Sequence, residues 1–340
     1  MTPMLGIMAS QISGHLAVNS SAVVITTDLT PFVTAYPWSA GFGTKYADPA
    51  SLPASQGFTP AFNPAKNTIA VTYTTSPYVS VYPWSAGFGT KYADPATLPT
   101  GNGRGVAFNQ DGTAIAIAHS VAPYVTAYPW SAGFGTKYAN PATTPTGTSV
   151  QVNWNPAGTS IAVAHNTSPY ITAYPWSSGF GTKYADPATL AAGDAYGGAI
   201  WNPAGTSIAL AVQPSPYIYT WAWSSGFGTK YANPATLPTG LGVNVKWNRV
   251  GTAIAFGHLN SPYITAYPWS AGFGTKYADP ASLPNGAARG ISFTAFDDAV
   301  ALAVANSPFI EAYSWSAGFG TKYSNPATLP NGLGFGVTYN

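Results

Sequence analysis

Residues 36–50 read YPWSAGFGTKYADPA, and seven close copies of this stretch, itself included, occur along the 340-residue chain. The tryptophan of each copy falls 46 or 47 residues after the tryptophan of the copy before it. A period of about 40–50 residues with strand-like content is typical of propellers and solenoids. Seven copies that nearly fill the chain predict a closed ring, so this repeat decides the fold before any single motif does.

One repeat, residues 105–142, predicts four short strands. Gly105–Asn109 is a short apolar run, and Ala114–Ala118 alternates Ile with Ala at the two-residue period of a strand. Tyr124–Tyr128 is rich in aromatic and β-branched residues, and the proline after it ends the strand or restricts it to an edge. A fourth, irregular outer strand follows. Since no stretch shows a sustained helical period, we expect an all-β, seven-bladed β-propeller with about 46 residues in each four-stranded blade.

The C-terminal segment predicts how the ring closes. Residues 336–340 align with the first strand of a repeat, and no second strand follows them. We therefore expect Val337–Asn340 to pair beside Ala22–Ile25 and to complete the first blade, because an unpaired apolar strand would leave an exposed edge. Residues 1–18 then remain as an N-terminal arm or a degenerate strand, and residues 19–340 form a single propeller.

The composition excludes several classes of function. Charged residues make up 6% of the chain, against about 25% in typical soluble domains. The net charge is +2, and seven of the twelve basic residues occupy one repeat position, so we expect no nucleic-acid partner. No apolar run approaches the roughly 18 residues of a spanning helix, which predicts no membrane insertion. Residues 1–18 lack the basic start of a signal peptide, and the chain has no cysteine for a disulfide or a thiol nucleophile.

Two repeated side chains are candidates for a sevenfold surface site. The tryptophans, with their neighbouring tyrosines, either stack against sugar faces or fill the space between blades. The lysines either bind a ligand or cover an aromatic ring with their aliphatic stems. The fourteen residues are Trp38, Trp84, Trp130, Trp176, Trp223, Trp269, Trp315, Lys45, Lys91, Lys137, Lys183, Lys230, Lys276 and Lys322.

Departures from the repeat mark candidates for asymmetric contacts. Arg104 and Arg289 share one position just before a predicted first strand. Lys246 falls inside a predicted first strand, where it could face the central channel. Asp194 and Tyr196 lie in the connection that carries one extra residue.

No residues with catalytic or metal-binding spacing stand out. His119, His165 and His258 share one repeat position, so a ring would hold them too far apart to bind one metal ion. The acidic position of the repeat is Asp in four copies and Asn in three, which fits a turn former better than a metal ligand. We expect no catalytic residue, no metal and no cofactor.

The turn sequences resemble those of the WD40-like propeller family. The stretches Phe108–Gly112 and Trp154–Gly158 match the turn between the first two strands of that family, although the Trp-Asp pair is absent. The YPWSxGFGTKYxxPA repeat is also similar to repeats in structural proteins of tailed bacteriophages. The resemblance implies a non-enzymatic interaction platform, a head decoration or a tail or adhesion module. Its partners would be capsid or tail proteins, and it would lie in the virion after synthesis in the host cytoplasm.

Two other functions remain open from the sequence. A multivalent lectin would use the repeated aromatic residues to bind cell-surface glycan, with an extracellular location. An enzyme would place its site at the mouth of the channel, with single residues contributed by different blades.

Overall fold

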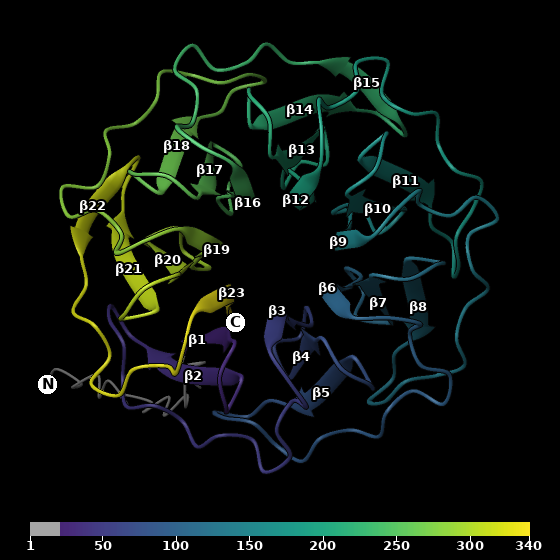
Figure 1. Cartoon of the computed structure of the whole chain (residues 1–340), viewed down its shortest axis with the longest axis horizontal. Coiled ribbons are helices and arrows are strands. Elements are labelled where there is room, and N and C mark those ends of the chain that lie inside the picture. The colour runs from purple at the N-terminus through teal and green to yellow at the C-terminus, as the bar shows by residue number, and fades with distance from the viewer. Residues whose placement is uncertain (1–20) are drawn as a thin grey trace, which may run out of the picture.

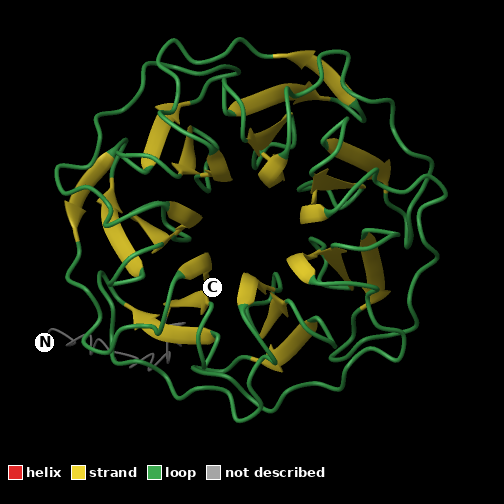
Figure 2. Ribbon diagram, in the orientation of Figure 1, coloured by secondary structure: helices red, strands yellow, loops and turns green. Residues whose placement is uncertain are grey.

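The computed structural model describes residues 21–340, so the expectation for residues 1–18 lies outside the described residues. The chain forms seven antiparallel sheets arranged in a ring around a central opening (Figure 1). Strands and loops make up all of the described chain (Figure 2). A helix long and apolar enough to cross a membrane is therefore absent from residues 21–340. The expectation of an all-β, propeller-like fold is confirmed.

Each sheet contributes one strand to the inner edge of the ring (Figure 1). These inner strands are β3 (Gly57–Phe62), β6 (Gly103–Phe108), β9 (Ser149–Trp154), β12 (Ala195–Trp201), β16 (Gly242–Trp247), β19 (Ala288–Phe293) and β23 (Gly334–Tyr339). The second strands are β1 (Ser21–Thr27), β4 (Thr68–Tyr73), β7 (Ala114–His119), β10 (Ser160–His165), β13 (Ser207–Val212), β17 (Ala253–His258) and β20 (Ala299–Val304). The third strands are β2 (Val33–Trp38), β5 (Val79–Pro83), β8 (Val125–Pro129), β11 (Ile171–Pro175), β14 (Ile218–Trp223), β18 (Ile264–Pro268) and β21 (Ile310–Trp315).

The expectation of four strands in every sheet is wrong for five of the seven sheets. Among residues 21–340, only two sheets have an outer strand, β15 (Phe227–Lys230) and β22 (Phe319–Lys322). In the other five, the outer segment makes one isolated bridge, as between Trp130 and Phe134. The residue before the repeat tryptophan explains the difference, because it is proline in these five sheets and Ala222 or Ser314 in the two with an outer strand. Proline keeps the carbonyl that accepts from the outer segment but lacks the N–H that would extend the ladder.

The repeat tryptophan packs between neighbouring sheets. Trp130 is 5% exposed and makes edge-to-face contacts with Tyr92, Phe108 and Phe134, at centroid distances of 5.2, 5.6 and 5.1 Å. Tyr92 belongs to the previous repeat, so the cluster joins two sheets. Edge-to-face geometry is favoured between aromatic rings and adds to the burial of their apolar surface.

The C-terminal strand pairs with the first described strand. Val23, Val24 and Ile25 of β1 lie opposite Tyr339, Thr338 and Val337 of β23, and β23 forms the inner edge of this sheet. The side-chain amide oxygen of Asn340 accepts a hydrogen bond from the Ala22 N–H at 2.7 Å, and the Asn340 N–H donates to the Ala22 carbonyl at 3.0 Å. The expected pairing of the chain ends is confirmed.

Deleting residues 334–340 should lower the free energy of unfolding by about 5 kcal/mol or more, because the buried Val337 and Tyr339 and one side of the β1 ladder are lost together. Urea denaturation of the truncated and full chains measures the change. Thr338→Ala, which removes a side chain directed away from the sheet interfaces, serves as the control and should unfold within about 0.5 kcal/mol of the parent. Equal stability of the truncated and full chains would show that β23 contributes little to the ring.

Three histidines lie buried at equivalent ends of second strands. His119, His165 and His258 are fully buried, and the Nε2 atom of each forms a hydrogen bond with a threonine hydroxyl on the third strand at 2.8–2.9 Å. Burial lowers the pKa of each imidazole to about 4. Val212 and Val304 occupy the same position in β13 and β20, so the site accepts an apolar side chain.

These histidines should make the fold acid-sensitive. The unfolded chain takes up protons at a pKa near 6.5, while the folded chain resists protonation until about pH 4, so stability is full above pH 6.5 and falls as the pH drops toward 4. Each histidine should contribute about 2–3 kcal/mol of this loss by pH 4.5.

Replacing all three histidines by valine should flatten the dependence of stability on pH between 6.5 and 4.5, as measured by urea denaturation at several pH values. Single replacements should each remove about one third of the slope. An unchanged slope in the triple variant would assign the acid sensitivity to other groups.

Candidate functional site

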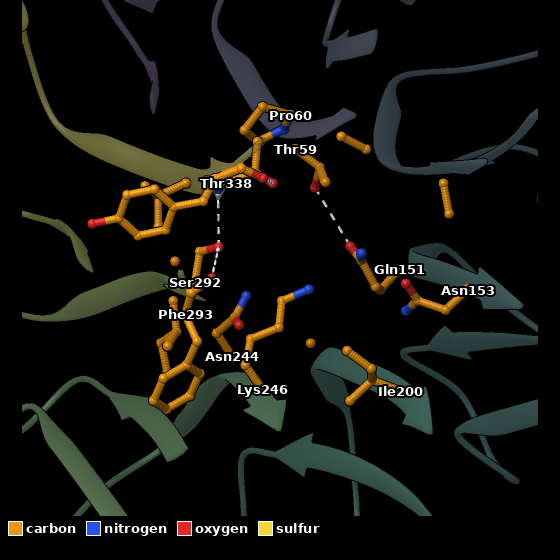
Figure 3. Close-up of a pocket in the computed structure, with 18 of the residues that line it drawn as sticks. Thr59, Pro60, Gln151, Asn153, Ile200, Asn244, Lys246, Ser292, Phe293 and Thr338 are labelled. Atoms are coloured by element: carbon orange, nitrogen blue, oxygen red, sulfur yellow. Dashed lines mark hydrogen bonds between the residues drawn. The ribbon is translucent and has the colours of Figure 1, made fainter. Parts of the chain in front are cut away.

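The seven inner strands enclose a cavity of about 1020 Å³. Its wall comes from every inner strand and from several of the turns that join inner to second strands. Figure 3 shows the Gln151 amide of β9 and the Asn244 amide and Lys246 ammonium of β16 directed into this space. The volume is at the upper end of the range for small-molecule pockets.

Inner-strand residues that face the cavity differ from sheet to sheet, although the rest of the repeat is nearly constant. The second residue of the inner strand forms a ring at one level of the cavity: Phe58, Arg104, Val150, Tyr196, Val243, Arg289 and Phe335. A second level, nearer the turns that join inner to second strands, is formed by Ala61, Ala107, Asn153, Ile200, Lys246, Ser292 and Thr338. The outer parts of the sheets keep the repeat because they all meet the same neighbours, whereas the cavity wall carries the variation.

Basic side chains concentrate at the cavity wall. Seven of the twelve basic residues are the repeat lysines, and all of the other five line the cavity: Lys66, Arg104, Lys246, Arg249 and Arg289. Among the described residues, no aspartate or glutamate side chain lines it. Low-dielectric walls that carry charge of one sign concentrate the field inside a cleft and attract ions of the opposite sign.

Buried polar atoms without a hydrogen-bond partner concentrate at this cavity. Within residues 21–340, nine buried side-chain nitrogen or oxygen atoms have no partner in the protein, and six of them belong to cavity residues. They include the Nε atoms of Arg104 and Arg289 and the Oδ1 atom of Asn244. Such atoms are rare in folded proteins and call for an explanation, of which a bound ligand is one.

Lys246 is the charged residue of the second level. It lies on β16, half-buried, with the Asn244 amide two residues before it on the same strand. Burial lowers the pKa of its ammonium to about 8, because the charged form loses solvation inside the ring. Lys246 forms no ion pair with a carboxylate of the described chain. It therefore stands as a cation that an anionic ligand would neutralise.

The structure brings together four of the five expected asymmetric residues. Arg104, Tyr196, Lys246 and Arg289 all line the cavity, from β6, β12, β16 and β19. Tyr196 is 50% exposed, at the level of the two arginines. Asp194 lies outside the cavity lining, where its carbonyl accepts a hydrogen bond from the Gln213 N–H at 3.0 Å.

The repeated tryptophans and lysines lie away from the cavity. The seven tryptophans are 5–7% exposed and sit between sheets. Four of the lysines form ion pairs with the aspartate three residues later, as Lys45 does with Asp48 at 2.6 Å, and Lys137 and Lys230 donate to an asparagine at the same place. Lys322 instead pairs with Glu311 at 2.7 Å, a fully buried carboxylate that occupies a threonine position of the repeat.

Sequence reasoning missed several cavity residues. Lys66 and Arg249 lie in turns, where a basic side chain ordinarily points to solvent, and Gln151 and Asn153 lie on β9 without any known motif. An alignment of the seven first strands could have found the β9 residues, because the cavity-facing positions of these strands vary between repeats while the positions beside them are nearly constant. Across residues 21–340 there is no cluster of three or more His, Asp or Glu side chains that could hold a metal ion.

Comparison with known proteins supports the fold alone. No protein-family model and no curated protein sequence matches the chain. Solved structures do resemble it at 8–14% sequence identity. A protein of unknown function from Desulfotomaculum acetoxidans has a TM-score of 0.70, with 8% identity, 93% of this chain and 98% of that chain covered. A periplasmic gluconolactonase from Pseudomonas aeruginosa has a TM-score of 0.70, with 13% identity and coverages of 94% and 99%. A putative 6-phosphogluconolactonase from Bacteroides uniformis has a TM-score of 0.68, with 14% identity and coverages of 94% and 99%.

These comparisons correct the functional expectation. The interpretation as a non-enzymatic phage component followed from the likeness of the repeats to phage repeats and to the WD40-like family. Two of the three similar structures above are instead named as lactonases, and none of the three is a phage protein. The resemblance to propellers holds for the fold, and the phage interpretation is wrong.

Proposed function

We propose that the seven sheets are the blades of one closed propeller whose central cavity binds a small anionic, hydroxylated compound such as a sugar acid. The observation that carries the proposal is the distribution of charge. All five basic residues outside the repeat line one cavity, in a chain that is only 6% charged, and no described acidic side chain joins them.

The chemistry of the wall supports this class of ligand. Ammonium and guanidinium groups form strong, charge-assisted hydrogen bonds with carboxylate and phosphate oxygens. Gln151, Asn153, Asn244 and Ser292 add amide and hydroxyl groups suited to the hydroxyls of a sugar chain. The lactonase names of two similar structures concern compounds of this chemistry, which favours the same class here.

Lys246→Met should weaken gluconate binding at least tenfold at pH 7, measured by isothermal titration calorimetry, because an ammonium group of the cavity wall is lost. The fold should tolerate the change, since methionine fills a similar volume and removes a desolvated charge. Lys137→Met, which removes a lysine outside the cavity, is the control and should bind gluconate as the parent does. Equal binding by the parent and Lys246→Met would contradict the proposed site.

Gluconate affinity should also fall as the pH rises through about 8, since only the protonated Lys246 attracts the anion. We expect a loss of about tenfold between pH 7 and pH 9.5. This dependence of gluconate affinity on pH should persist in Lys66→Met, which alters the other lysine of the cavity, and should disappear in Lys246→Met. A pH-independent affinity in the parent would exclude Lys246 from the binding site.

Lactone hydrolysis is a second candidate function, favoured by the same lysine. No described Asp, Glu or His side chain lines the cavity, so the neutral Lys246 amine is the group there that could accept a proton near neutral pH. Water would attack the lactone carbonyl and lose a proton to the amine, and the ring C–O bond would break as the ammonium returns that proton to the leaving oxygen. The neighbouring cations would stabilise the oxyanion intermediate.

Gluconolactone hydrolysis above the spontaneous rate should therefore rise with pH through about 8, opposite to the trend in gluconate binding. Lys246→Met should abolish this excess rate and Lys137→Met should retain it, in a pH-stat assay corrected for the uncatalysed reaction. Full activity in Lys246→Met would remove the lysine from the reaction.

A further inference from the structure

At the level of the second inner-strand residues, two arginines and two phenylalanines form a continuous arc. The Arg104 guanidinium carbon lies 5.5 Å from the Phe58 ring centroid, and that of Arg289 lies 5.3 Å from the Phe335 centroid. The two phenylalanine rings meet edge to face at 5.3 Å. The arc therefore runs across four adjacent inner strands, β6, β3, β23 and β19.

The backbone holds this arc in place. The Thr26 hydroxyl donates to the Phe58 carbonyl and the Thr59 hydroxyl donates to the Arg104 carbonyl, both at 2.7 Å. Gly336 allows the inner strands to approach, because a Cβ atom there would lie 2.3 Å from the Phe58 carbonyl oxygen. The aromatic rings and guanidinium groups are thus positioned before any ligand arrives, which reduces the entropy lost on binding.

Both guanidinium groups retain hydrogen-bonding capacity. Their buried Nε atoms have no partner among residues 21–340. Asp28 is the acidic residue whose charge acts on Arg289. Its carboxylate already accepts a hydrogen bond from the Leu333 N–H at 2.8 Å. A planar guanidinium with free N–H groups is suited to a carboxylate or phosphate.

Lys246 lies on the second level of the same cavity, further along its strand than the arginine level. It follows the second residue of β16 by three positions, which is about 10 Å along a strand. Gln151 and Asn244 occupy the level between the two, where they can bond with hydroxyl groups. The cavity thus has a cationic site at each end of a neutral, polar segment.

We infer that the cavity selects ligands with an oxyanion at both ends, separated by a hydroxylated chain of about six carbons. One oxyanion lies at Lys246 and the other lies at Arg104 or Arg289, the two ends of the arc, with the apolar face of the chain against Phe58 and Phe335. The inference rests on the proposed function and adds the number and spacing of the charges.

Calorimetry with three acids at constant pH and ionic strength tests the inference. Glucarate and gluconate share a six-carbon hydroxylated chain but carry two carboxylates and one, whereas malonate carries two carboxylates too close together to reach both sites. Glucarate should bind at least tenfold more tightly than either of the others. 6-Phosphogluconate, with a phosphate at one end, shows whether the second oxyanion is better filled by phosphate or by carboxylate, and tighter binding of either long dianion supports the inference.

Variants test which residues bind the second oxyanion of the ligand. In the Arg104→Met, Arg289→Met double variant, glucarate should fall to the affinity of gluconate. The single variant Arg289→Met should lose part of the difference in affinity between glucarate and gluconate. Circular dichroism shows whether each variant folds, and the single variant replaces the double variant if the latter does not fold. Lys137→Met, which removes a charge outside the cavity, should retain the full difference.

If glucarate and 6-phosphogluconate both bound to the parent no more tightly than gluconate, the inference would be overturned while the proposed function stayed intact. Equal binding of glucarate and malonate would also overturn it, because charge alone would then explain the preference. Failure of every acid to bind would overturn the proposed function together with the inference.

Discussion

The contact on which the rest of the structure depends is the edge-to-face packing of one tryptophan between each pair of neighbouring sheets. Trp130 touches Tyr92 from the previous repeat and Phe108 and Phe134 from its own, and the same arrangement recurs around the ring. Because every interface uses the same rings, every repeat must keep the same sequence around its tryptophan. The near-identity of the repeats is thus a packing requirement of the outer ring, and it needs no sevenfold ligand.

The inner strands are not subject to this packing requirement, and their polar and basic side chains line the cavity. Their cavity-facing residues meet space and one another, so they can differ between repeats without disturbing an interface. The result is a wall on which Arg104, Lys246 and Arg289 each occur on a different strand while the surrounding scaffold stays constant. A binding site in this cavity would combine residues from several repeats, so its residues do not form a contiguous sequence motif.

Much of the fold could be predicted from the sequence, and part of the site could not. The tryptophan spacing predicted the repeating all-β architecture, and the match of residues 336–340 to a first strand predicted the β1–β23 pairing. The outer strand was overpredicted because Pro129 removes an N–H that only the ladder geometry shows to be needed. Arg104, Lys246 and Arg289 stood out as departures from the repeat. Lys66 and Arg249 could not be assigned, because their proximity to the cavity depends on how turns from distant repeats meet once the ring has formed.

The pairing of β1 with β23 also sets an order for folding. Six of the seven sheets are contiguous in sequence and can form from neighbouring hairpins as soon as their residues are available. The remaining sheet joins Ala22 to Asn340, 318 residues apart, so it cannot be completed until β23 has been synthesised. Until then β1 lacks the inner neighbour that β23 provides, and the growing chain must keep this edge from other strands. β23 therefore completes the wall of the cavity, and this wall is whole only once β23 has paired with β1.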